Sequence, residues 1–221
     1  MDHMDRAKDK IMMGSERRSM VMSEKEKKLT AYHEAGHAIV AEFCEHADKA
    51  QKVTIIPRGQ ALGVTFTPPE EDVFLHSSEK LMAQICKGLG GRAAEEIVFG
   101  EVSTGASNDL EKIAQIARNM ITVYGMSEQA PNISLVDHQQ DLFLGQGPGI
   151  RQHSEKLEQM IDDETQEIIR ACYADAKQIL TDKRDKLEKM AKVLLEKEKM
   201  DERDIVAILG PRNSDNATTS P

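Results

Sequence analysis

The chain has 221 residues, of which 39% are hydrophobic, and this is enough for one sizeable folded core. Its formal net charge of -9 argues against nucleic acid as a partner, because binding phosphates requires a basic face. No apolar run approaches the length of a membrane span and no signal peptide is recognisable, so we expect a soluble piece that neither crosses a membrane nor carries a secretion signal.

The first predicted helix spans residues 23–45, after a flexible start or cloning remnant at residues 1–6. Ser23 and Glu26 have the spacing of a capping box, which marks a helix N-terminus. Apolar residues then recur at spacings of three and four, and His33 and His37 fall on the same face. Gly36, a poor helix former, lies between them and suggests that something packs closely against this turn.

A β-hairpin is predicted next, with strands at residues 52–57 and 62–67 that are separated by a Pro-Arg-Gly turn and stopped by two prolines. Strands this short leave an edge that another chain can pair with. The hairpin therefore offers one place where an extended polypeptide could bind.

The remainder of the chain is predicted to be mostly helical. A helix capped by Ser78 runs to the glycine pair at 90–91, and a second piece continues it through residues 92–98. A turn of small residues at 103–109 opens another helix, with Asp109 in its first turn, that ends at Gly125. Residues 126–153 form a long loop, and residues 154–210 form three helices. We expect this last part to serve as scaffold or subunit contact, followed by a disordered tail at 211–221.

The three cysteines of the chain have no paired spacing. Cys44, Cys86 and Cys172 each fall among apolar positions of a helical pattern. This arrangement predicts reduced thiols in the core, without cysteine chemistry.

The segment His33-Glu34-Ala35-Gly36-His37 matches the HExxH pattern. Residues four apart on a helix lie one turn above each other, so the two imidazoles can bind one Zn²⁺ while Glu34 lies beside them as candidate base. The structural alternative is a solvated helix with two unrelated histidines. The inward face of both histidines argues against it, because buried imidazoles need hydrogen-bond partners or a metal.

A catalytic zinc needs a third protein ligand. The extended metzincin pattern is excluded, because Val40 and Phe43 occupy the positions of its glycine and third histidine. His46 would lie on roughly the opposite face of the helix. The candidates that remain are Glu95, Glu96, Asp109, His76, His138 and His153. A position at a helix N-terminus favours Asp109 modestly, because the helix dipole stabilises a carboxylate there, whereas Glu95 and Glu96 more often make surface salt bridges.

Five ordered segments carry a resemblance to a known family: TAYHEAGHA at 30–38, VTIIPRG at 53–59, LGVT at 62–65, GGRAAEE at 90–96 and STGASNDL at 103–110. Together they resemble the peptidase domain of the FtsH family of membrane-anchored, ATP-dependent (AAA+) zinc metalloproteases, and the likeness covers about residues 7–209. It implies a mainly α fold, a helical metallopeptidase domain with a small β-hairpin near the zinc site and a C-terminal helical bundle. Residues 7–150 would form the zinc peptidase core, and residues 151–210 the bundle of the same domain. The resemblance also implies that Asp109 is the third zinc ligand.

The family has parts that this sequence lacks. No phosphate-binding loop and no membrane span occur, so we expect an ATPase module and an anchor to precede residue 1 in the parent protein, with ATP bound there and not by this chain. The resemblance further implies a homohexameric ring, unfolded or membrane-extracted polypeptides as substrates, a role in protein quality control, and a place at the cytoplasmic face of the inner cell membrane. The residues from Asn132 onward depart from the family pattern.

The predicted reaction is hydrolysis of peptide bonds by water that one Zn²⁺ activates, with His33, His37 and Asp109 as ligands and Glu34 as general base. The substrate backbone would pair with the strand formed by Leu62, Gly63, Val64, Thr65 and Phe66, although a hairpin that merely covers the site is an equal alternative. Two rival functions remain open. One is a non-catalytic helical oligomerisation module with a structural metal, and the other is a zinc hydrolase that acts on a small molecule.

Overall fold

The computed structural model describes residues 10, 12, 14–17, 20, 22–59, 61–69, 75–135 and 154–210. Its elements in chain order are α2 (Glu24–Phe43), β1 (Lys52–Thr54), β2 (Val64–Phe66), α3 (Ser78–Phe99), the short 3₁₀ helix η1 (Thr104–Ala106), α4 (Ser107–Thr122), α5 (Glu155–Asp182), α6 (Arg184–Lys197), β3 (Lys199–Asp201) and α7 (Glu202–Leu209). The expected flexible start, the expected tail and residues 136–153 of the expected loop lie outside the described residues. The mainly α fold with a small sheet is confirmed.

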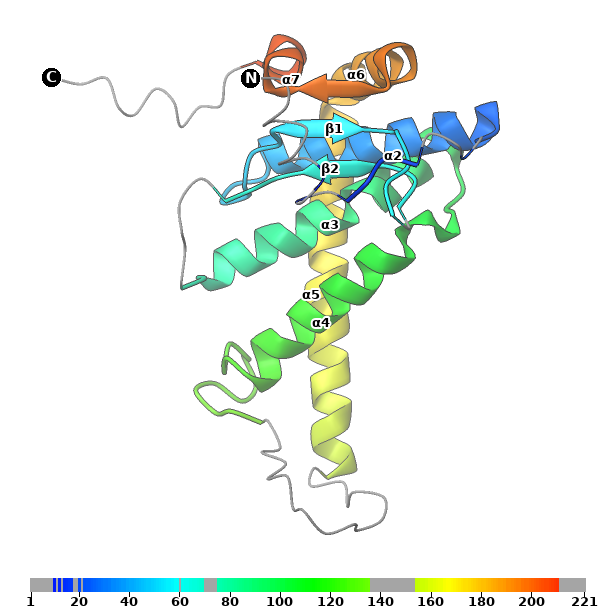
Figure 1. The fold of residues 1–221 in the computed structure, drawn as a ribbon. Helices are drawn as coiled ribbons and strands as arrows, with labels where there is room; N and C mark the ends of the chain where they lie inside the picture. The colour runs from blue at the N-terminus through cyan, green and yellow to red at the C-terminus, as the bar shows by residue number, and fades with distance from the viewer. Residues whose placement is uncertain are drawn as a thin grey trace, which may run out of the picture.

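The long helix α5 runs through the length of the molecule, and α2, α3 and α4 lie across it (Figure 1). The small sheet lies beside α2, at the end of the molecule that also holds α6 and α7 (Figure 1). The core between these helices is aliphatic, with fully buried residues such as Ile39, Ile85 and Leu180. No helix of the described residues combines the length and the apolar character that crossing a bilayer requires.

Helix α2 begins where its capping box predicts. The Glu26 amide donates to Ser23 Oγ at 3.2 Å, and the Ser23 amide donates to Glu26 Oε2 at 2.8 Å. Because each side chain satisfies an amide that has no partner inside the helix, the start of α2 is fixed by local sequence.

Two glycines allow α2 and α3 to cross in close contact. A Cβ atom at Gly36 would lie 2.4 Å from the carbonyl oxygen of Gly90, and a Cβ atom at Gly90 would lie 2.8 Å from that of Gly36. The expectation that something packs closely against Gly36 is therefore confirmed, and the partner is backbone.

The prediction of two helical pieces around the glycine pair at 90–91 is wrong. Helix α3 is continuous from Ser78 to Phe99, and its N-cap is Ser77, whose side chain accepts from the Lys80 amide. The two glycines sit on the face that crosses α2, so they mark a close approach of helices and not a helix end.

The sheet has one strand more than the predicted hairpin. Its order is β2-β1-β3, with Val53 of β1 opposite Thr65 of β2 on one side and opposite Met200 of β3 on the other. Within the described residues, β1 is thus the central strand and β2 an edge strand. The bundle of α5, α6 and α7 is joined to the N-terminal part both by this pairing and by the packing of α5 on α3.

Candidate metal centre

Three side chains form a triangle between α2 and the start of α4. Nε2 of His33 lies 3.0 Å from Nε2 of His37, and Oδ2 of Asp109 lies 3.4 Å and 3.3 Å from these two nitrogens. Ligands bound tetrahedrally to Zn²⁺ at roughly 2.0 to 2.1 Å lie about 3.3 to 3.4 Å from each other. The two distances to Asp109 therefore match the edge of a zinc tetrahedron, and the distance between the two nitrogens is about 0.3 Å shorter. Among the described residues, no other group of three or more His, Cys, Asp or Glu side chains is placed to hold a metal ion.

Local structure explains how the triangle forms. His33 and His37 lie one turn apart on α2, in a run from Thr30 to Ala41 that is entirely buried. Asp109 stands in the first turn of α4, directly after η1 bends the chain. The positive end of the α4 dipole favours a carboxylate at this position.

Each histidine is held by its second ring nitrogen. Nδ1 of His33 lies 2.7 Å from Oε1 of Glu95, and Nδ1 of His37 lies 2.8 Å from the carbonyl oxygen of Lys87. The Gly91 amide lies 3.3 Å from the same His37 nitrogen, but the shorter contact with an oxygen that carries no proton assigns Nδ1 as the donor. Both Nε2 atoms are then left with lone pairs that face the centre of the triangle.

Glu95 is itself fully buried and well supported. Its Oε2 accepts from the Ser103 amide at 2.6 Å, and its Oε1 accepts from Ser103 Oγ at 3.1 Å. Burial raises the pKa of Glu95, but the hydrogen bonds with His33 and Ser103 outweigh this effect, and the net pKa lies below its usual value. The carboxylate therefore stays ionised. An ionised carboxylate behind a histidine orients the ring and makes it a better metal ligand.

The electrostatics of the triangle require a positive charge at its centre. Burial lowers the pKa of His33, but hydrogen bonds with Asp109 and Glu95 and the nearby Glu34 outweigh it and raise the pKa to about 10. Burial likewise raises the pKa of Asp109, yet its hydrogen bonds with His33 and His37 bring the net value well below the ordinary range. A proton on His33 and a metal cation between the three atoms are alternative ways to supply this charge.

Glu34 lies against the edge strand. The side chain is 6% exposed, and burial raises its pKa. Its Oε2 accepts from Thr65 Oγ1 at 2.7 Å, while a Cβ atom at Gly63 would lie 2.7 Å from its Cγ and Oε1. A carboxylate whose pKa is shifted upward is suited to accept and return a proton near neutral pH.

A cleft of about 1190 Å³ opens over these residues. It is lined by both histidines, Glu34 and Asp109, and on one side by residues 61–65. Of the five residues predicted to bind substrate backbone, Leu62, Gly63, Val64 and Thr65 line the cleft, whereas Phe66 does not. The edge strand thus borders the space in which a ligand of the metal centre would lie.

The other predicted candidates for the third ligand take different positions. Glu96 accepts hydrogen bonds from the Tyr173 hydroxyl and, at 2.9 Å, from Lys177 Nζ. His76 is exposed just before α3. His46, which the helix geometry had excluded, is exposed and lies 4.0 Å from Glu45. His138 and His153 lie outside the described residues.

Sequence reasoning missed the residues around the triangle. The expectation of a surface salt bridge fails for Glu95, which is buried behind His33. Gly91 was predicted as part of a helix end, yet a Cβ atom there would lie 2.5 Å from His33 Nε2. The only signal for either in the sequence is their proximity in the GGRAAEE segment, which does not reveal what they touch.

The chain is similar to a known family and to several curated proteins. The sequence model of a family described as Peptidase family M41 matches residues 20–208 of this chain. An ATP-dependent zinc metalloprotease FtsH of Pelodictyon phaeoclathratiforme is 48% identical over 208 residues, which are 94% of this chain and 31% of that protein. FtsH 4 of Sorangium cellulosum is 47% identical over 93% of this chain and 32% of its own length, and FtsH of Magnetococcus marinus is 45% identical over 98% and 32%. The chain spans about a third of the length of the curated relatives that it matches.

Proposed function

The chain belongs to peptidase family M41, and from this membership we propose that it is the proteolytic domain of an FtsH-like, ATP-dependent zinc metalloprotease. The observation that carries the proposal is the triangle of His33, His37 and Asp109 at close to tetrahedral spacing, with the buried carboxylate of Glu34 beside it. This arrangement offers three ligands and leaves one side open to the cleft, which is the pattern of a catalytic zinc and not of a closed structural one.

His33, His37 and Asp109 would hold the Zn²⁺ ion. When bound, the ion would supply Lewis acidity, which makes water acidic enough to lose a proton near neutral pH and polarises the scissile carbonyl. Glu34 would take the proton from the attacking water and deliver it to the leaving amine. Glu95 and the Lys87 carbonyl would keep both Nδ1 atoms protonated, so that both Nε2 atoms remain ligands.

The substrate would be an extended polypeptide. The edge of β2 borders the cleft, and Thr65 of this strand also contacts the base Glu34. Backbone pairing with Leu62–Phe66 would bring a peptide bond near the metal centre and would depend little on substrate side chains. Unfolded chains suit this mode because their backbone groups are free.

For the whole protein, we propose that a separate ATPase module delivers unfolded or membrane-extracted polypeptides, that six copies form a ring, and that it acts at the cytoplasmic face of the inner membrane. Support comes from the relatives, whose names include ATP-dependent proteolysis, and from the family resemblance. Residues 7–150 and 151–210 would act as two parts of one domain, since β1 pairs with β3 and α3 packs on α5.

The test uses the zinc-loaded protein with unfolded casein and with a short quenched peptide that needs no ATP-driven delivery. We expect cleavage of the peptide that a chelator abolishes and zinc restores. A metal that is bound tightly with four protein ligands, together with no cleavage, would favour the structural module. Cleavage of small amides or esters but of no peptide would favour the small-molecule hydrolase.

A further inference from the structure

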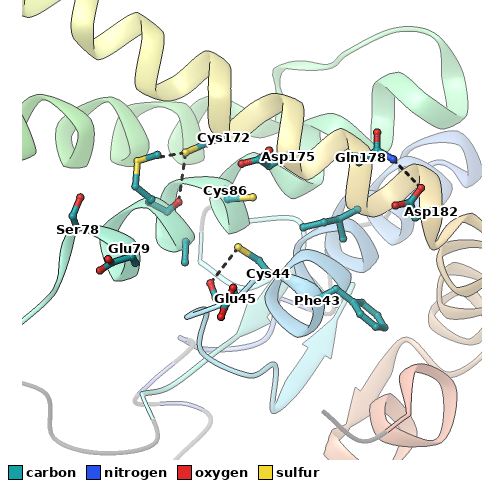
Figure 2. A pocket seen from close by; sticks show the side chains of 13 residues that line it. Phe43, Cys44, Glu45, Ser78, Glu79, Cys86, Cys172, Asp175, Gln178 and Asp182 are labelled. Carbon is teal, nitrogen blue, oxygen red and sulfur yellow. Dashed lines mark hydrogen bonds between the residues drawn. The ribbon is translucent and has the colours of Figure 1, made fainter. Parts of the chain in front are cut away.

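All three cysteines of the chain line one pocket, although they are far apart in sequence. The pocket has a volume of about 500 Å³ and lies where the end of α2, the first half of α3 and the C-terminal half of α5 meet (Figure 2). Cys44 directly follows α2, Cys86 belongs to α3 and Cys172 belongs to α5. We call this space the thiol pocket, and none of the proposed metal ligands lines it.

Two of the three thiols form a pair. Figure 2 shows the side chains of Cys44 and Cys86 next to each other in the pocket, and Cys44 is the neighbour that raises the pKa of Cys86 most. Cys44 Sγ donates to the neighbouring Glu45 carbonyl oxygen at 3.5 Å, whereas Cys172 Sγ donates to the Met82 carbonyl oxygen of α3 at 3.6 Å and lies 4.0 Å from Met82 Sδ. The pocket therefore contains a dithiol and a third cysteine that serves as an internal comparison.

The two paired thiols differ in access to solvent. Cys86 is 3% exposed, whereas Cys44 is only partly buried at the rim formed by the end of α2. An oxidant from solution reaches Cys44 at the rim first, and the buried thiol of Cys86 lies beside Cys44. This is the arrangement of an accessible thiol with a resolving thiol beside it.

We propose that Cys44 and Cys86 are a redox-sensitive dithiol that a hydroperoxide converts to an intramolecular disulfide. In the first step the Cys44 thiol attacks the peroxide O–O bond, which gives a sulfenic acid on Cys44 and releases an alcohol, or water from hydrogen peroxide. In the second step Cys86 sulfur attacks the Cys44 sulfur, the S–O bond breaks, and water leaves with the proton of Cys86. The two cysteines lose two electrons, and the peroxide gains them.

The surroundings of Cys86 assign it to the second step. The neighbouring Cys44 thiol, then burial, raise the pKa of Cys86, so little thiolate is present before Cys44 is oxidised. Cys172 and Asp175 of α5 act in the same direction on Cys86. Burial also raises the pKa of Cys172, to about 12, so this thiol is protected.

The disulfide would form close to the metal centre. Cys86 directly precedes Lys87, whose carbonyl oxygen accepts the hydrogen bond from His37 Nδ1. The bond would also close a loop that contains β1 and β2 and would join the end of α2 to α3 covalently. Formation of this disulfide requires only the two neighbouring thiols and a peroxide, and it does not depend on the proposed peptidase activity.

The test treats the protein with hydrogen peroxide, blocks free thiols with iodoacetamide, digests without reduction and identifies linked peptides by mass spectrometry. We expect a peptide pair joined through Cys44 and Cys86 that disappears on reduction with dithiothreitol. Cys172→Ser should give the same linked pair, because this thiol is a bystander. Cys44→Ser, a change at the rim that leaves the core intact, should give none.

Other results would overturn the proposal. One is wild-type protein in which Cys44 proceeds to sulfinic acid while Cys86 remains free. A second is a link that involves Cys172 in preference to Cys86, and a third is a link between two copies of the chain. Recovery of all three cysteines as free thiols, under peroxide that oxidises an added exposed-thiol peptide, would also exclude it.

Discussion

The substitution Gly91→Ala tests whether backbone proximity positions the histidine of the proposed zinc site. A Cβ atom at this position would lie 2.5 Å from Nε2 of His33 and 2.6 Å from Cδ2 and Cε1. An ordinary contact begins at 3.4 Å, so the imidazole must retreat by about 0.9 Å. Metal sites tolerate deviations of only about 0.2 Å in ligand distance, and a shift of this size removes His33 as a ligand.

The expected effect on the fold is much smaller. Alanine in place of a helical glycine favours α3 by about 1 kcal/mol, while overpacking of the core costs roughly 1 to 3 kcal/mol. The metal-free variant should therefore unfold within a few degrees of wild type, whereas zinc affinity and peptide cleavage should fall by about 100-fold or more. Chelator competition measures the first of these two losses, and kcat/KM on the quenched peptide measures the second.

Gly88→Ala is the matched control. It lies on the same helix and gains the same propensity, but its Cβ atom would meet a methyl carbon of Ile113 at 2.6 Å and no proposed ligand. Zinc affinity of this variant should stay close to wild type. Equal zinc affinity and equal kcat/KM in the Gly91 and Gly88 variants would refute the reasoning.

Three further outcomes follow from the charges of the site. Glu34→Gln should keep zinc but lose about 10²- to 10⁴-fold in peptide cleavage. Burial raises the pKa of Glu34, so the protein is more stable with this carboxyl neutral, and that stability is lost as pH rises through the raised pKa. The metal-free variant should therefore melt higher than wild type at neutral pH and at the same temperature at about pH 4. Undiminished cleavage would contradict the role as base, and an unchanged melting curve would contradict the cost of ionisation. Glu95→Gln should weaken zinc binding by about 10- to 100-fold in chelator competition, since the ionised partner of His33 is lost, and wild-type affinity would contradict that role. Zinc binding at pH 7 should release about one proton, because the pKa of His33 is about 10 in the metal-free site and the metal displaces its proton. Calorimetry in buffers of different ionisation enthalpy measures this proton release. No release would show that His33 is already neutral before zinc binds.

Helix α2 could be predicted because its information is local. The capping box fixes its start, the spacing of apolar residues identifies its buried face, and the HExxH pattern places the histidines on that face. The three C-terminal helices were predictable for the same reason, since apolar residues recur along one face of each. Asp109 is different: its position at a helix start favoured it only modestly over the other candidates, and the family resemblance singled it out.

What the sequence did not reveal depends on partners far along the chain. Strand β3 has three residues, Lys199–Asp201, with a single buried side chain and no period to detect, and it exists because β1 is available to pair with it. Glu95 looked like a surface acid, yet it is buried, where it accepts a hydrogen bond from His33, 62 positions away. Such residues acquire their role from tertiary packing, which overrides local propensity.

Glycine explains why the metal centre in particular resists prediction. The same residue type ends helices, permits turns and allows close approach, and the sequence does not say which. Here backbone closes on α2 from two sides, with α3 against His33 at Gly91 and the residue just before the edge strand, Gly63, against Glu34. Because no side chain stands between them, the two groups are positioned by main chain that is itself held in a helix and a sheet. A larger residue at either glycine should therefore disturb the chemistry before it disturbs the fold, which is the opposite order from most substitutions in a core.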